Sequence, residues 1–342
     1  MSYIFKNTEI NNEKASVFET KSLLYLIGKR NDSKEIEYVT FDCFNDVSGI
    51  NKNHNQIWDI QSKNEASLSP KKIGTYFFTL FDNFTSAFTF KEFIFFCPIL
   101  KDEYKIDCNL RSYEINNIVD KTKTRIKKGL IEEVNRVKTD SIDYSSQIDR
   151  FLNLVTIVED NETDKEYIKS ITKFKQSKIK SDEFYKSVFV ELRDIQSSKK
   201  NSYIENETIT EIREVLSFRR HLFVKDIEIL IVNRIIGVEI FKNILYNPIY
   251  FSDFTNHLSI EDKKDFLQEC NSNLSRAFFN KNSNRVFWKV CENIISHTSI
   301  HESNDVDLIY NEVFVSYTPR VSFLNEITIK YLISIILEGI KW

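Results

Sequence analysis

Three polar residues in the first part of the chain have types suited to phosphodiester hydrolysis. Asp46 precedes the short motif Gln61-Ser62-Lys63 within the segment FDCFNDVSGINKNHNQIWDIQSKN. A carboxylate with neighbouring oxygen atoms binds Mg²⁺, which prefers hard oxygen ligands and keeps several water molecules. The metal polarises a phosphoryl oxygen and acidifies a bound water, while a nearby lysine orients that water or stabilises charge on the phosphate. The pattern therefore predicts a metal-dependent phosphodiesterase centre.

Two strands must bring these residues together. Residues 36–44 are rich in β-branched and aromatic side chains and predict a strand. The polar segment 45–56 predicts a turn. Residues 57–63 predict a second strand, which we expect to pair with the first as a hairpin.

Side chains alternate between the two faces of a strand. Trp58 and Ile60 are therefore expected to face the core, and Asp59, Gln61 and Lys63 the opposite side, next to the acid that ends the first strand. This alternation makes the polar groups converge on one spot. Asp59 supplies a carboxylate on this face.

Helices and one more strand are expected around this pair. The apolar spacing in residues 15–29 predicts an amphipathic helix. Ser69-Pro70 is a helix start, with serine as N-cap and proline at the first helical position. The apolar run 92–100 predicts a strand buried on both faces. This order indicates an α/β core, a small mixed sheet flanked by helices.

The rest of the chain has a different pattern. Charged helical stretches are predicted at 113–138 and 161–200, with one further strand at 151–158. The polar segment NSYIENET at 201–208 predicts a boundary. Apolar stripes beyond it predict helices at about 208–220, 225–246, 260–279, 284–298 and 323–340. We expect an α/β domain at 1–200 and a mostly α-helical regulatory or interaction domain at 201–342.

Asp46 followed by Gln61-Ser62-Lys63 resembles the D…QxK variant of the PD-(D/E)xK nuclease motif. Its context is a helix with Glu19, the strands VTFDCFNDV and WDIQSKN, a helix, and the strand FIFFCPI. This order is similar to the N-terminal endonuclease domain of bacterial CBASS effectors and of related subunits in Lamassu-type and other ABC-ATPase-linked anti-phage systems. The resemblance covers residues 10–105 and implies a restriction-endonuclease-like core.

The resemblance also implies roles for individual residues. Asp46 would be the principal metal ligand, Gln61 would take the place of the usual acidic ligand, and Lys63 would be the catalytic lysine. Glu19 matches a helix-borne acid that completes the site in many relatives, so the implied metal ligands are Asp46, Gln61 and Glu19. Asp42 is a weaker candidate for a second acid.

The function implied is that of a Mg²⁺-dependent endodeoxyribonuclease, with Mn²⁺ as a substitute. It would be an effector subunit of a bacterial anti-phage defence system that cuts double-stranded DNA when activated. The implied partners are DNA and either another copy of the chain, an SMC-like ABC ATPase subunit, or both.

Other interpretations remain open. A neutral amide at Gln61 is a poorer Mg²⁺ ligand than a carboxylate, so a non-enzymatic assembly or adaptor subunit with a degenerate nuclease fold is the alternative. Asp46 also suits an Asx turn, Gln61 and Lys63 suit a solvated strand face, and Glu19 suits a solvated helix face. A nucleotide-sensing helical half ranks low, because the sequence lacks a glycine-rich phosphate loop.

Composition narrows the possible partners. The 342 residues carry a formal net charge of −3, so contact with DNA requires a local patch or a metal ion. The basic run Lys121–Lys128 is the best candidate, although a solvated helix face has the same pattern. His297 and His301 lack a third ligand at a fitting spacing and are expected at the surface.

Localisation follows from the cysteines and the apolar stretches. Five scattered cysteines without a CxxC pair predict reduced, mostly buried thiols in a cytoplasmic protein. The apolar stretches are too short or too often interrupted by charge to span a bilayer, so no membrane partner is expected.

Overall fold

The computed structural model describes residues 2–6, 13–176, 179–201, 203–315, 317 and 319–340. Two compact units share the chain. The first comprises Met1–Tyr167 and Phe189–Val224, and the second comprises Ile168–Val188 and Lys225–Trp342. The expected domains 1–200 and 201–342 stay a prediction, and the packing units divide the chain at other positions.

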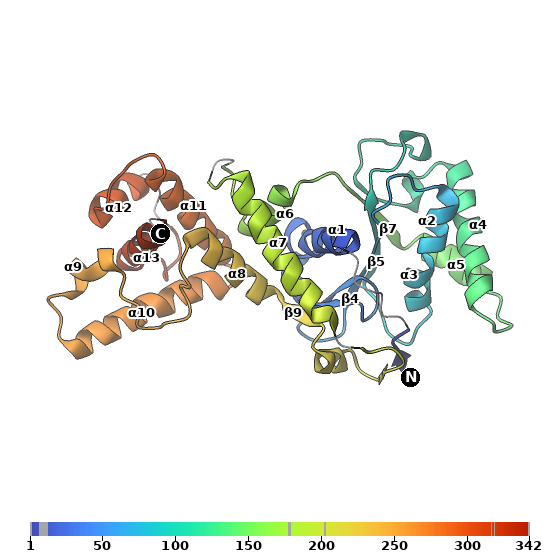
Figure 1. Ribbon diagram of the computed structural model, residues 1–342, viewed down its shortest axis with the longest axis horizontal. Coiled ribbons are helices and arrows are strands. Elements are labelled where there is room, and N and C mark those ends of the chain that lie inside the picture. Colours follow the sequence, from blue (N-terminus) through green and yellow to red (C-terminus); the bar gives the residue numbers. More distant parts are fainter. Residues whose placement is uncertain are drawn as a thin grey trace. The chain divides into compact units, whose positions relative to one another are not determined.

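A seven-stranded mixed sheet forms the centre of the first unit, in the order β6-β7-β5-β4-β3-β2-β9 (Figure 1). Its strands are β2 (Ile36–Phe41), β3 (Val47–Asn51), β4 (Ile57–Ser62), β5 (Glu92–Pro98), β6 (Ser112–Glu114), β7 (Val155–Asp160) and β9 (His221–Phe223). Strands β4, β5 and β7 run parallel, and the other neighbouring pairs are antiparallel. A separate pair joins β1 (Tyr3–Ile4) to β8 (Thr208–Ile209).

Helices cover both faces of this sheet (Figure 1). They are α1 (Glu13–Leu24), which continues as a π-helical turn at Tyr25–Lys29, α2 (Pro70–Tyr76), α3 (Phe78–Phe84), α4 (Asp120–Val137), α5 (Ser145–Leu152), α6 (Asp164–Thr172) and α7 (Asp182–Ser198). Short 3₁₀ turns lie at Ser33–Glu35, Asp102–Tyr104, Ile115–Asn117, Lys199–Asn201 and Ile212–Phe218. The predicted helix start is confirmed, because the Ser69 side chain accepts a hydrogen bond from the Lys72 amide.

Strand β5 shows how the two layers pack. Phe95 contacts Phe77 of α2's C-terminal end, with ring centroids 5.2 Å apart. Phe96 contacts Phe18 of α1, with centroids 5.0 Å apart. The strand is therefore buried on both faces, as its continuous apolar run predicts.

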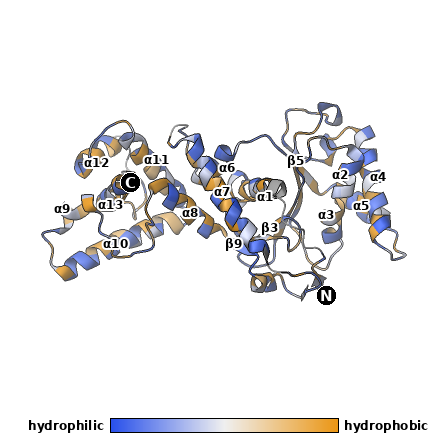
Figure 2. Cartoon of the chain, viewed as in Figure 1, coloured by the Kyte–Doolittle hydropathy of each residue, from blue (hydrophilic) through white to orange (hydrophobic). Residues whose placement is uncertain are grey.

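The second unit is helical. Its elements are part of α6 and α7, then α8 (Val224–Ile236), a 3₁₀ turn at Ile249–Phe251, α9 (Ser252–Thr255), α10 (Ile260–Phe279), α11 (Asn284–Thr298), α12 (Val306–Phe314) and α13 (Glu326–Ile340). Figure 2 shows hydrophobic and hydrophilic residues alternating around α10 and α11. In α13, Tyr331, Leu332 and Ile335 are fully buried, so this apolar terminal helix is a core helix of its unit.

The structure corrects several predicted elements. The predicted hairpin is wrong, because β3 forms within the polar segment 45–56 and separates β2 from β4. The predicted helix at 208–220 is replaced by β8, whose Thr208 and Ile209 pair with β1, and by a 3₁₀ turn at Ile212–Phe218. Helix α8 stops before Gly237, whose φ of 87° favours glycine, instead of continuing to 246.

Two small parts of the predicted segments lie outside the described residues. They are residues 177–178 of the predicted helical stretch 161–200 and residue 202 of the predicted boundary.

The cysteines match the prediction of mostly buried thiols. All five cysteines are free, and four of them are buried. None of the described helices combines the length and apolar character that a bilayer span requires.

Two glycines set the distance between α2 and α4. A Cβ atom at Gly74 would lie 2.0 Å from the Ile126 carbonyl oxygen, and one at Gly129 would lie 2.0 Å from the Lys71 carbonyl oxygen. Both glycines are therefore required by the close approach of two helix backbones. This packing fixes α2, which follows β4 directly in the chain.

We expect Gly129→Ala to lower the free energy of unfolding by about 2 kcal/mol or more, because backbone must move to admit the methyl group. Urea denaturation of this variant and of Lys128→Ala, an exposed neighbour on α4, measures the effect. Helix propensity alone would make Gly129→Ala stabilising by about 1 kcal/mol, so a gain in stability contradicts the packing argument.

Candidate functional site

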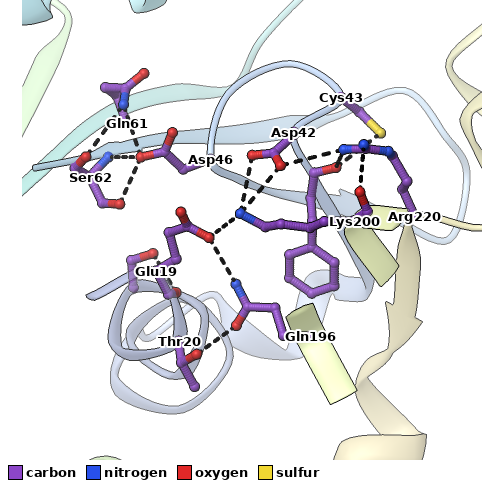
Figure 3. Close-up of polar contacts among 12 residues, drawn as sticks. Glu19, Thr20, Asp42, Cys43, Asp46, Gln61, Ser62, Gln196, Lys200 and Arg220 are labelled. Atoms are coloured by element: carbon purple, nitrogen blue, oxygen red, sulfur yellow. Dashed lines mark hydrogen bonds and ion pairs between the residues drawn. The ribbon is translucent and has the colours of Figure 1, made fainter. Parts of the chain in front are cut away.

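Asp46 lies directly before β3 and is held at the end of β4. Its Oδ2 atom accepts hydrogen bonds from the Gln61 side-chain amide at 2.9 Å, and from the Ser62 backbone amide and hydroxyl at 2.7 Å each (Figure 3). No hydrogen bond from the described residues reaches Oδ1. Three donors thus fix one oxygen of a buried carboxylate and leave the other for a ligand.

Gln61 links Asp46 to helix α3. Its amide nitrogen donates to Asp46, and its amide oxygen accepts a 2.6 Å hydrogen bond from the Thr79 hydroxyl. The oxygen is the only amide atom that binds a metal ion. In this arrangement Gln61 orients Asp46, and its own potential ligand atom is engaged by Thr79.

Asp59 lies on β4 and is fully buried. Its carboxylate accepts hydrogen bonds from the side chains of Asn45, Ser48 and Asn83 at 2.5–2.8 Å. Burial raises the pKa of Asp59 to about 6, although the three hydrogen bonds oppose this. Its oxygen atoms are occupied by internal donors, so Asp59 stabilises the loop before β3.

Lys63 follows the last residue of β4. Its backbone amide donates to the Phe96 carbonyl oxygen at 3.0 Å, and its ammonium nitrogen lies 5.4 Å from the centre of the Tyr76 ring. Among the described residues, the cavity beside Asp46 is lined by Asp46 and Gln61 but not by Lys63. The structure thus joins Asp46 to Gln61, and places the amine of Lys63 against α2.

Glu19 reaches this region from α1. Its carboxylate forms an ion pair with Lys200, which also lies 3.3 Å from Asp42 (Figure 3). Burial raises the pKa of Glu19 to about 8; the Lys200 ammonium opposes the shift, and the carboxylates of Asp46 and Asp42 add to it. The carboxylates of Glu19 and Asp46 are therefore close enough for their negative charges to repel each other.

A second cation neutralises the loop after β2. Arg220 is buried beside β9, and its guanidinium lies 3.4 Å from Asp42 and donates to the Lys200 carbonyl oxygen at 3.0 Å. Asp42 has a φ of 50°, a left-handed conformation that aspartate tolerates better than most residues. Burial raises the pKa of Asp42, and Lys200 opposes this.

A cavity of about 660 Å³ opens beside Asp46. Its lining combines aromatic side chains, amides and charged groups: Tyr3, Lys6, Asp42, Cys43, Phe44, Asn45, Asp46, Gln61, Phe78, Thr79, Asp82, Asn83, Val137, Lys138, Thr139 and Asp140. Lys6 and Lys138 both pair with Asp82, at 2.6 and 2.8 Å. A ligand entering this cavity would meet the Asp46 side of the site.

The donor types suit a hard divalent cation, because Asp46 and Glu19 supply carboxylate oxygens in one electrostatic field. Within the part of the chain that the structure describes, no group of three or more His, Cys, Asp and Glu residues is arranged to hold a metal ion. The positive charge at Glu19 comes instead from Lys200. His297 lies 2.8 Å from Glu312 and stacks near His301, in the second unit.

Sequence reasoning missed Lys200 and placed Arg220 only at the end of the helix expected at about 208–220. Both residues lie far along the chain from the motif, and neither belongs to a local pattern that indicates an acidic partner. Strand pairing supplies the missing information, because β9 pairs with β2 and sets Arg220 beside Phe41.

The raised pKa of Glu19 gives a testable dependence of stability on pH. Between about pH 4.5 and 8, the folded protein keeps a proton on Glu19 that the unfolded chain has released, and above this range the ionised carboxylate pairs with Lys200. The free energy of unfolding therefore falls as pH rises through this range. In metal-free buffer, we expect Glu19→Gln to reduce this fall in the free energy of unfolding by about 1–3 kcal/mol. Urea denaturation at a series of pH values tests this, and identical slopes in both proteins would contradict it.

Comparisons with known proteins add one finding. No family model matches the sequence, and no curated protein matches it. Two solved structures match, both described as the Acinetobacter baumannii Cap4 SAVED/CARF-domain containing receptor, one of them with the cyclic trinucleotide 3'3'3'-cAAA. Each has a TM-score of 0.35, with 13% and 14% identity, and covers 84% of this chain and 69% and 68% of those chains. The similarity is distant, and it assigns neither a family nor a function.

Proposed function

We propose that this chain is a metal-dependent DNA endonuclease, the effector subunit of a bacterial anti-phage defence system that cuts double-stranded DNA when activated. The observation that carries the proposal is the meeting of Asp46, Gln61 and Glu19. They come from the loop before β3, from β4 and from α1, respectively. Asp46 and Gln61 line one cavity, and the carboxylate of Glu19 interacts electrostatically with that of Asp46.

The order of elements supports a restriction-endonuclease-like core. A helix with Glu19 is followed by strands β2 and β4, by helices α2 and α3, and by β5, in the order on which the sequence resemblance rests. Strand β3 is an addition to that order. It places Asp46 at the end of β4 through the antiparallel pairing of Val47 with Ile60.

The chemistry divides between a metal ion and the chain. A bound Mg²⁺ would polarise the phosphate and activate a water molecule. Asp46 and Glu19 are the proposed ligands, and Gln61 holds Asp46 in its orientation. Lys63 is half-buried over Tyr76, and its proposed role is to stabilise charge on the phosphate of a bound DNA strand.

A local basic face is available for DNA. On α4, the side chains of Lys121, Arg125 and Lys128 are exposed at helical spacing. Lys127 is partly neutralised by Asp149 at 2.5 Å. Because the chain carries a formal net charge of −3, this face is our candidate for backbone phosphate contacts.

The wider context of the proposal rests on the sequence resemblance. It includes defence against phage, assembly with another copy or with an SMC-like ABC ATPase, and regulation by the helical unit. A nuclease that cuts host DNA must be inactive until triggered, which requires such regulation.

One observation favours the alternative, a non-enzymatic assembly subunit. The amide oxygen of Gln61 accepts a hydrogen bond from Thr79 and is engaged there, and the amine of Lys63 lies against Tyr76, while Lys63 does not line the cavity beside Asp46. An activity measurement with defined variants separates the two functions.

Cleavage of supercoiled plasmid with Mg²⁺ and with Mn²⁺ tests the proposal. We expect wild-type protein, at a protein concentration high enough for activation, to nick or linearise the plasmid. Asp46→Asn and Lys63→Ala should cleave it at least about a hundredfold more slowly, as is typical for removal of such groups. Glu19→Gln should raise the concentration of Mg²⁺ that is needed for half-maximal cleavage.

Asp253→Asn and Lys264→Ala are matched controls, because they make the same changes at exposed positions in the helical unit. Both should cut at the wild-type rate. Equal residual cutting by all variants would point to a contaminating nuclease and overturn the assignment of this site.

A further inference from the structure

Lys200 occupies the acidic centre of the candidate site. Its ammonium pairs with Glu19 and lies 3.3 Å from Asp42, and its side chain is only 9% exposed (Figure 3). It follows α7, in the 3₁₀ turn Lys199–Asn201, and reaches acids that lie before residue 50. A lysine is thus built into a position between carboxylates.

The neighbouring contacts keep Lys200 in this position. Arg220 donates to its backbone carbonyl oxygen, and one turn earlier Gln196 accepts a 2.8 Å hydrogen bond from the Thr20 hydroxyl. Thr20 is adjacent to Glu19 on α1. Contacts to both chain segments therefore fix the lysine and its acid relative to each other.

The charges explain why a cation is present. The centre contains the carboxylates of Glu19, Asp42 and Asp46, and burial of such groups without a cation is costly. Lys200 and Arg220 supply the positive charge. A divalent metal ion at Glu19 would lie within a few ångströms of the Lys200 ammonium, where like charges repel strongly because the dielectric constant is low.

We propose that Lys200 is the counter-ion of the metal-free site, and that a divalent cation binds Glu19 and Asp46 only after the Lys200 ammonium has moved away. Lys200 is then a positioning residue that limits metal loading. The inference rests on the proposed function, in which these two carboxylates are metal ligands. It gives the nuclease a built-in inactive state that any event displacing the 199–201 turn would release.

Binding of Mn²⁺ to the DNA-free protein tests the inference without reference to activity. Electron paramagnetic resonance of free Mn²⁺ gives the dissociation constant for wild type and for Lys200→Met. Removal of one positive charge from the site should tighten binding by about tenfold or more. Unchanged or weaker binding by folded Lys200→Met overturns the inference.

A second variant covers the case in which Lys200→Met fails to fold. Lys200→Met/Asp42→Asn removes one charge of each sign and keeps the net charge, and asparagine suits the left-handed φ of position 42. It should bind Mn²⁺ more tightly than wild type. Adding Asp46→Asn should abolish the gain, and persistence of the gain would show that the ion binds elsewhere.

Lys21→Met is the matched control. Lys21 lies on α1 near Glu19 and pairs with Asp160 at 2.8 Å, so its removal takes the same charge from a different partner. Its Mn²⁺ affinity should stay within about twofold of wild type, since its charge is compensated locally. An equal gain in Mn²⁺ affinity in Lys21→Met would show that the effect depends only on net charge, and it would overturn the inference.

The failures of the two proposals are distinguishable. Tighter Mn²⁺ binding that depends on Asp46, with no plasmid cleavage by any variant, upholds the role of Lys200 and rejects the nuclease. Plasmid cleavage by wild type, with Mn²⁺ affinity unchanged in Lys200→Met, upholds the nuclease and rejects the role of Lys200.

Discussion

The negative charges of carboxylates that are buried at one end of the strands must be balanced by hydrogen bonds or cations. The first unit is organised around this requirement. An ionised acid moved from water into a protein interior costs several kcal/mol unless hydrogen bonds or cations replace the water. The structure uses both means. Neutral donors surround Asp46 and Asp59, whereas the cations Lys200 and Arg220 serve Glu19 and Asp42.

This requirement accounts for the discontinuous path of the chain. The acids lie before residue 60, but their cations come from residues 189–224, which return to the first unit after an excursion into the second. Strand β9 adds to the free edge of β2 and carries Arg220 to the Phe41 carbonyl. Pairing of β1 with β8 secures the same return. The chain crosses between units so that charge within the sheet unit is balanced locally.

Local signals explain what the sequence predicts and what it misses. Strand β5 was predicted because it is a continuous apolar run, and helices α10 and α11 because their apolar residues recur at helical spacing. Strand β3 was missed because Ser48 and Gly49 carry the signals of a turn, although Gly49 is needed where Leu26 packs closely. The meeting of Asp46 and Gln61 was expected, but through a hairpin of β2 with β4, whereas β3 lies between these strands in the structure. Lys200 was not expected, because its position depends on pairing between distant strands, which leaves no trace in local composition.

Gln61 has a physical role in the metal-free state that an acid could not fill. Its amide donates to Asp46 and accepts from Thr79 at once, so it joins the loop before β3 to α3 across β4. A carboxylate at this position would face Asp46 with like charge, would offer no donor, and would add to the negative charge of the centre. The amide therefore lowers the demand for a metal at rest. Lys200 supplies a positive charge at Glu19. Under the proposed function, a metal ion would have to displace this charge before it could bind the two carboxylates.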